Sequence, residues 1–139
     1  MKFPWHSDRK VAEGVAGGRY ASESVVASRT APGVTFTIAK MSFGRRVELM
    51  RRVRELARRK EFLAASEEVG GKMDEALLNA EIERLFVTWG LKAVAGLAVD
   101  GSMASPELLA EAGPEELFRE ALAAVRRETG LSEEERKNS

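Results

Sequence analysis

The stretch that most constrains the fold is a run from Ser42 to Ala65 with the period of an amphipathic α-helix. On a helix of about 3.6 residues per turn, its apolar side chains occupy one arc, and arginine and glutamate fill the opposite side. The arc is formed by Leu49, Met50, Val53, Leu56, Ala57, Leu63 and Ala64. Ser42 is a good N-cap, because its hydroxyl can accept a hydrogen bond from a first-turn amide. The sequence therefore predicts a long helix here.

A second helical period follows the Gly70-Gly71 pair and predicts a helix over about 73–89. Only a few residues separate the two helices, so we expect them to pack antiparallel as a helical hairpin. Gly90 is expected to end the second helix as a left-handed cap, with Leu91 folding back as its apolar partner.

Two further helices are predicted in the C-terminal part. Ser105 and Pro106 are typical of an N-cap and a first helical position, which predicts a short helix that ends near Ala112. A Gly-Pro pair follows and starts a last helix over 114–129, with Gly130 as its cap.

The β-structure predicted from the sequence is small. Residues 34–39 alternate between large apolar and small side chains, which is typical of a half-buried strand. Residues 97–104 predict a miniature hairpin, because the pair Asp100-Gly101 favours a type I′ turn. Pairing of this hairpin with the strand would give a three-stranded sheet. We therefore expect a mainly α fold: a helical hairpin plus two C-terminal helices, with a short N-terminal strand and a mini β-hairpin in a small antiparallel sheet.

Composition divides the chain into three parts. Residues 1–33 are rich in glycine and serine without a sustained apolar period, which predicts a flexible, disordered N-terminal extension. We expect a single helical domain over 34–131 and a polar tail over 132–139. The sequence has no cysteine, no secretory signal and no run of about 18 apolar residues, which predicts a cytoplasmic protein without disulfides.

The formal net charge of zero conceals a strong asymmetry. Residues 1–60 contain 14 Lys/Arg and 5 Asp/Glu, a net charge of +9, whereas residues 61–139 contain 8 and 17, a net charge of −9. One interpretation is that the two halves fold onto each other and neutralise. The other is that they present opposite faces, which favours head-to-tail association of copies or binding of a charged partner.

No residue pattern is typical of a catalytic, cofactor or metal site. The only histidine, His6, lies in the predicted extension, and no glycine-rich nucleotide motif follows a strand. Acidic pairs lie at predicted helix N-termini, where the helix dipole already accounts for them. We therefore expect no catalytic residue, cofactor or metal, and a protein that is not an enzyme.

The basic side of the first helix is the main alternative site. Residues 45–60 contain eight Arg/Lys and two Glu, and such a stripe can neutralise phosphates. Against nucleic-acid binding, Glu48 and Glu55 have the spacing of helix-surface ion pairs with arginines three and four residues later. No aromatic residue is interleaved, and the rest of the chain is acidic.

Six residues are candidates for binding a protein partner. Three are arginines of the first helix, and three are aromatic residues near the ends of the two hairpin helices, which form either a partner groove or the core. These candidates are Arg51, Arg54, Arg58, Phe62, Phe86 and Trp89.

Five segments, in this order, resemble the small tail assembly chaperones of long-tailed bacteriophages and prophages. They read VTFTIAK, SFGRRVELMRRVREL, LLNAEIERLFVTWGLK, GLAVDGSMASPELLAEAGPEELFREAL and GLSEEERKNS. The resemblance covers about residues 34–139, and its most telling parts are the segment from Gly96 to Leu108 and the polar ending.

The resemblance implies a non-enzymatic role in the host cytoplasm. Many copies would coat the tape-measure protein, associate with one another, and be displaced by tail-tube protein, so that none remains in the mature virion. A longer product made by ribosomal frameshifting would recruit the tube protein. The alternatives are a minor tail or connector protein retained in the virion, or a nucleic-acid-binding regulator that uses 45–60.

Overall fold

The computed structural model describes residues 15–66, except residue 17, and residues 71–130. This part of the chain contains four α-helices, one three-stranded antiparallel sheet and two two-stranded ladders. The helices are α1 (Phe43–Ser66), α2 (Gly71–Gly90), α3 (Pro106–Ala112) and α4 (Glu115–Thr129). The predicted fold class, mainly helical with a small antiparallel sheet, is confirmed.

The local start and stop signals are confirmed at three helix ends. The Ser42 hydroxyl accepts a hydrogen bond from the Arg45 amide at 3.2 Å, just before α1. The Ser105 hydroxyl accepts one from a first-turn amide of α3 at 3.1 Å. Gly130 ends α4 in the left-handed conformation, with φ 77°. These caps supply partners for backbone groups that a helix end leaves unpaired.

The central sheet has the order β3-β4-β5, and both strand pairs are antiparallel. Its strands are β3 (Glu23–Ala27), β4 (Thr35–Ala39) and β5 (Leu91–Ala95). The middle strand, β4, is the one that the alternation over 34–39 predicts. The register places Val26 and Val94 on either side of Phe36, so these three side chains share one face of the sheet.

The predicted boundary of the flexible extension at residue 33 is wrong, because β3 lies inside the predicted extension. This strand pairs with β4 along its whole length, and its side chains alternate between exposed and half-buried. Its apolar pair, Val25 and Val26, is short and has serines on both sides, so the pairing with β4 determines this strand more than its own sequence does. Residues 1–14 and the predicted tail over 132–139 lie outside the described residues.

The predicted miniature hairpin is present, but it is separate from the central sheet. Its strands are β6 (Ala98–Val99) and β7 (Ser102–Met103). Asp100 and Gly101 between them both have positive φ, 50° and 82°, which confirms the predicted turn. An equally short ladder joins β1 (Val15–Ala16) to β2 (Arg19–Tyr20).

The third strand of the central sheet is β5, which the sequence did not predict. Gly90 is not a left-handed cap; it is the last residue of α2 and leads directly into β5. A Cβ atom on Gly90 would lie 2.6 Å from Cγ1 of Val125, so the glycine is explained by its close approach to α4. Leu91 and Val94 are buried, which places β5 against the core. Since β3 and β5 pair with the two edges of β4, neither edge of β4 is left for the miniature hairpin.

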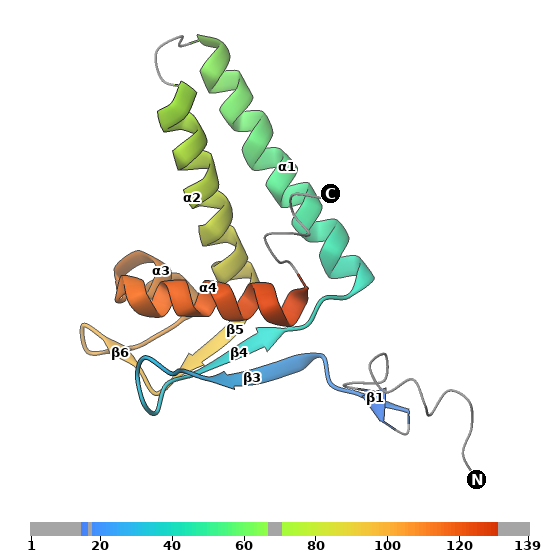
Figure 1. The fold of residues 1–139 in the computed structure, drawn as a ribbon, viewed down its shortest axis with the longest axis vertical. Coiled ribbons are helices and arrows are strands. Elements are labelled where there is room, and N and C mark those ends of the chain that lie inside the picture. Colours follow the sequence, from blue (N-terminus) through green and yellow to red (C-terminus); the bar gives the residue numbers. More distant parts are fainter. Residues whose placement is uncertain (1–14, 17, 67–70, 131–139) are drawn as a thin grey trace.

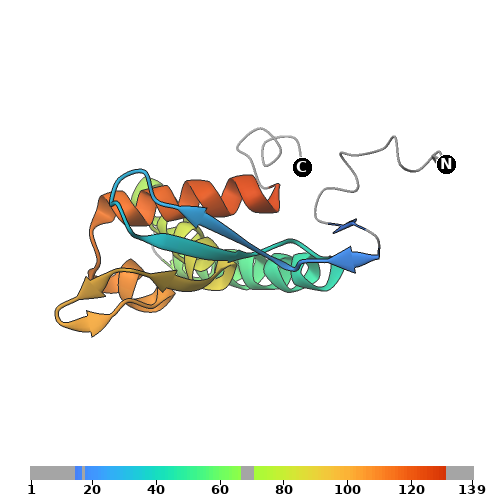
Figure 2. The same ribbon diagram turned by 90° about the horizontal axis from the view of Figure 1, so that it is seen from below.

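One face of the sheet is covered by α4 and by the end of α2 (Figures 1 and 2). Figure 1 also shows α1 and α2 rising away from this body as a hairpin, with the long α4 crossing its base. The core between the layers is formed by Phe36, Ile38, Val87, Leu91, Val94, Leu109, Leu117, Ala121, Leu122 and Val125.

Two glutamates of α4 hold the edge strand β3. Glu128 accepts a hydrogen bond from the Ser24 hydroxyl at 2.9 Å, and Glu120 accepts bonds from the Ser28 hydroxyl and the Arg29 amide, both at 2.6 Å. The two glutamates lie about 12 Å apart along a helix and the two serines about 13 Å apart along a strand, so the pairs match.

Replacement of Gly96 by alanine is expected to destabilise the fold more than the same change at Gly101. Both glycines have φ near 80°, but a Cβ on Gly96 would overlap the carbonyl oxygen of Gly33, whereas Gly101 has open space. We expect Gly101→Ala to cost about 1–2 kcal/mol for the left-handed conformation alone, and Gly96→Ala to cost at least about 2 kcal/mol more. Urea unfolding of the two variants measures the difference, and equal losses would show that the close approach is absent.

The hydrogen bonds to Glu120 predict a pH-dependent stability. Burial raises the pKa of the Glu120 carboxyl, but hydrogen bonds from Ser28, Arg29 and Thr30 outweigh it, so the pKa lies below its ordinary value. The stabilisation is therefore complete above the ordinary carboxyl pKa and is lost as the pH falls through the lower pKa of the folded state. We expect Glu120→Gln to cost about 1 kcal/mol near pH 7, because the contacts are partly exposed to solvent, and less at pH 3. Urea unfolding at both pH values tests this, and a pH-independent difference would contradict it.

Candidate protein-binding surface on the helical hairpin

The antiparallel packing of α1 against α2 confirms the predicted hairpin. Leu49 is buried, and Val53 packs against the same core cluster. From α2, Ile82 and Leu85 pack against this cluster as well. The two helices are closest at the connecting turn and diverge toward the body (Figure 1). Among the α1 side chains that the structure describes, those that pack against the core cluster lie on the inner side of the helix.

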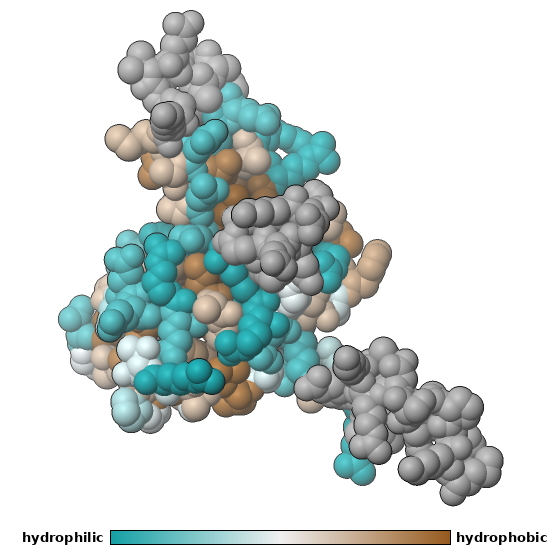
Figure 3. All heavy atoms as spheres, in the orientation of Figure 1, coloured by the Kyte–Doolittle hydropathy of each residue, from teal (hydrophilic) through white to brown (hydrophobic). Residues whose placement is uncertain are grey.

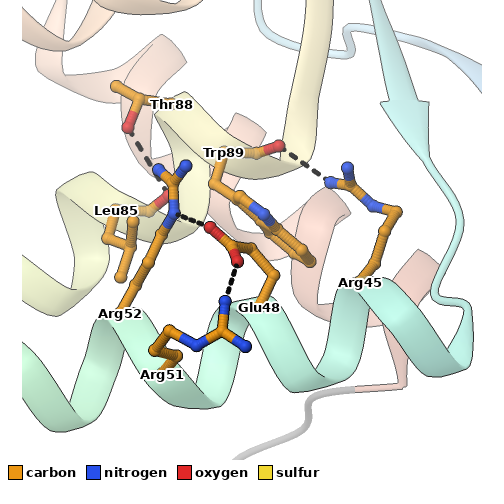
Figure 4. Close-up of polar contacts among 7 residues, drawn as sticks. All are labelled: Arg45, Glu48, Arg51, Arg52, Leu85, Thr88 and Trp89. Carbon is orange, nitrogen blue, oxygen red and sulfur yellow. Dashed lines mark hydrogen bonds and ion pairs between the residues drawn. The ribbon is translucent and has the colours of Figure 1, made fainter.

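A single arginine joins the two helices where they diverge. The Arg45 guanidinium lies over the Trp89 ring, 3.9 Å from its centroid, and donates a hydrogen bond of 2.9 Å to the Trp89 carbonyl (Figure 4). Burial lowers the pKa of Arg45, and the positive charge of Arg52 lowers it further. Its Nε is buried without a hydrogen-bond partner. Arg45 therefore holds the Trp89 side chain in place through contacts within the same chain.

Glu48 forms the ion pairs that its spacing predicts. It accepts hydrogen bonds from Arg52 at 2.8 Å and from Arg51 at 2.9 Å (Figure 4). The hydrogen bond from Arg52 is the main reason that the pKa of Glu48 lies below its ordinary value. Within the described residues, Glu55 forms no ion pair with the arginines that follow it. The second predicted pairing is therefore absent.

The outer face of α1 is not used by the fold. Phe43, Val47 and Met50 lie at spacings of four and three residues, so they share one side of the helix, and they are 85%, 38% and 63% exposed. Arg54 and Arg58 continue the same side and are exposed as well. We call these five residues the α1 outer face. Met50 belongs to the predicted apolar arc, but it lies at the edge of the arc that α2 does not cover.

A second exposed apolar pair lies on α2. Met73 and Leu77 are one turn apart and are 71% and 52% exposed. Figure 3 shows hydrophobic residues at the surface of the hairpin, between hydrophilic side chains. Exposed apolar side chains at helical spacing are typical of surfaces that bind another helix.

The six predicted partner-binding residues differ in their exposure to solvent. Arg51, Arg54 and Arg58 are exposed on α1. Phe86 is 4% exposed and is a core residue, so it offers no surface to a partner. Trp89 is half-buried under an arginine, and the side chain of Phe62 lies outside the described residues.

The residues that the sequence analysis missed are the exposed apolar ones. Phe43, Val47, Met73 and Leu77 were not among the candidates. The spacing of Phe43, Val47 and Met50 was a usable signal, but exposure depends on which side of α1 faces α2. The orientation of α1 relative to α2 cannot be read from the sequence.

A groove of about 500 Å³ lies between α1 and α2. Arginines and glutamates of both helices alternate along its walls, among them Arg52, Arg84 and Glu81. An enclosed cavity is what a small-molecule site requires, whereas this groove is open to solvent and lined mainly by charged residues.

Neither a metal cluster nor a bilayer-spanning helix is found where the structure can be described. No three His, Cys, Asp or Glu side chains of the described residues converge as metal ligands would. In the same part of the chain, no helix combines the length and apolarity needed to cross a membrane.

Removal of the Arg45 side chain is expected to loosen the start of α1 from the end of α2. The stacking on Trp89 and the hydrogen bond to its carbonyl together predict a loss of about 1–2 kcal/mol for Arg45→Ala. In a Trp5→Phe background, the fluorescence of Trp89 should shift to the red, because its ring becomes more hydrated. The adjacent, exposed Arg46 provides the control Arg46→Ala, which should change neither quantity. An unchanged Trp89 emission in Arg45→Ala would refute the stacking.

No protein-family model matches this chain, no characterised protein is significantly similar to it in sequence, and no solved structure matches its fold. The relationship to tail assembly chaperones, stated above from the sequence, therefore stays a prediction.

Proposed function

We propose that this chain is a non-enzymatic tail assembly chaperone of long-tailed bacteriophages or prophages, which binds and solubilises the tape-measure protein and helps to recruit tail-tube subunits. The observation that carries the proposal is the exposed apolar surface of the helical hairpin, which lies in two separate patches: Phe43, Val47 and Met50 near the start of α1, and Met73 and Leu77 near the start of α2.

This surface suits a helical client. A long helical protein buries its apolar side chains only after assembly, so a chaperone must offer apolar contacts at helical spacing in the meantime. The hairpin offers such contacts outside the core, since the buried cluster is completed by the sheet, α3 and α4. Binding therefore requires no opening of the fold.

The exposed arginines of α1 support a transient complex. In this proposal several copies coat one client in the host cytoplasm and are displaced by tail-tube protein before the virion is complete. A longer, frameshifted product brings the tube protein to the complex. Charge contacts at a surface are screened by salt and exchange readily, which suits a protein that must later leave.

A nucleic-acid-binding regulator is the second candidate. The observation that favours it is the pair Arg54 and Arg58, which form no ion pair within the described residues. The apolar residues of the same face weigh against it, because phosphates gain nothing from exposed Phe43 or Met50. A gel shift that is lost in a variant with Arg51, Arg54 and Arg58 changed to Glu would favour this candidate.

Co-expression with the tape-measure protein of the same phage tests the proposed function. We expect the soluble fraction of the tape-measure protein to rise several-fold, and to fall again when Met50→Glu and Leu77→Glu place charges on the hairpin. Met103→Glu is the matched control, since Met103 is exposed at least as much as Met50 and Leu77 but lies on β7.

Two outcomes contradict the proposed function. One is a tape-measure protein whose solubility does not depend on this chain. The other is recovery of the chain in stoichiometric amounts from purified particles by mass spectrometry, which would favour a retained minor tail or connector protein.

A further inference from the structure

The α1 outer face has two halves of different chemistry. Phe43, Val47 and Met50 give an apolar half at the N-terminal end, about 10 Å long. Arg54 and Arg58 give a basic half, which extends the same side of the helix by about 12 Å. The whole face therefore spans about four helical turns.

The basic half is not neutralised by the fold. Some surface arginines of the other helices have carboxylate partners: Arg84 pairs with Glu111 at 2.9 Å, and Arg119 pairs with Glu83 at 2.9 Å. Within the described residues, Arg54 and Arg58 have no such partner. The face thus carries two uncompensated positive charges directly beside exposed apolar side chains.

We propose that the α1 outer face is a docking site for an acidic amphipathic helix of a partner protein, a proposal that rests on the proposed function and names the chemistry of the client segment. The apolar stripe of such a helix covers the apolar half, and its carboxylates lie against Arg54 and Arg58. Two ion pairs at the edge of an apolar contact fix the direction and register of the partner helix, while the apolar half supplies most of the affinity.

Neither other occupant fits the face as well. A nucleic acid neutralises the arginines but leaves the apolar half in water. A second copy of this chain brings either an equally basic α1 or its α2, whose exposed Glu75 and Glu81 accompany an exposed apolar pair, Met73 and Leu77, of only one turn, which is too short to cover the apolar half. An acidic amphipathic helix satisfies both halves at once.

The probe is a synthetic peptide of 18 residues with leucines at helical spacing and glutamates on both flanks of the leucine stripe. Two matched peptides accompany it: one with every glutamate replaced by lysine, and one with the same composition in scrambled order. Fluorescence anisotropy with the full chain should show binding of the acidic peptide, and at least tenfold weaker binding of the lysine and scrambled peptides. Binding should weaken from about 0.05 M to about 0.5 M salt.

A charge swap locates the site. The double variant Arg54→Glu, Arg58→Glu should bind the acidic peptide at least tenfold more weakly and should gain affinity for the lysine peptide, which a folding defect cannot produce. Met50→Glu should weaken binding of the acidic peptide by about tenfold. The controls are Met103→Glu and the double variant Arg19→Glu, Arg29→Glu, which make the same chemical changes at exposed positions outside α1 and should leave the affinity unchanged.

Several results would overturn the inference. The first is equal affinity for the acidic and the lysine peptides. The second is loss of binding in the control variants but not in the α1 variants. The third is a self-association of the chain that the α1 variants abolish and that the acidic peptide does not inhibit.

If the tape-measure protein is solubilised equally by wild type and by the α1 variants, the inference fails and the proposed function stands. If the acidic peptide binds as expected but the tape-measure protein is not solubilised, the proposed function fails instead.

Discussion

The packing of β4 beneath α4 is the interaction on which the rest of the structure depends. β4 is the central strand, and Phe36 and Ile38 on its inner face are fully buried against the helical layer. Burial of two such side chains contributes roughly 3–6 kcal/mol, a large share of the stability of a small domain. Both edge strands are defined by their pairing to β4, and α4 in turn holds β3 through Glu120 and Glu128.

Because this core is complete without the outer side of the hairpin, that side is free to serve another purpose. α1 contributes Leu49 to the buried core and is joined to the end of α2 through Arg45 and Trp89. A change of Phe43 or Met50 to a polar residue therefore removes no packing from the fold. Exposed large apolar side chains increase the risk of aggregation, so their presence here is better explained by binding than by stability.

The sequence predicts the helices well because their ends are marked locally. Ser42, Ser105 and Gly130 each act within one turn of their own helix, and the Asp100-Gly101 turn is equally local. The strands β3 and β5 escaped prediction because each exists through its pairing with β4, which lies far away in sequence for β5. The same distinction applies to the site: the arginines of α1 were recognisable from composition, whereas the exposure of Phe43 and the burial of Phe86 follow from how α1 and α2 are oriented.

The arrangement of charge on α1 also limits what the apolar side chains can bind. Two chains that approached each other through their α1 outer faces would bring Arg54 and Arg58 of one copy against the same residues of the other when the helices are parallel, or against its apolar half when they are antiparallel. Like charges in a contact of low dielectric constant oppose the first arrangement, and burial of unpaired charges opposes the second. The repulsion leaves the apolar half available to partners of opposite charge, so the arginines select the partner as well as attract it. The exposed apolar residues and the unpaired arginines are therefore one feature, since each would be a liability on this helix without the other.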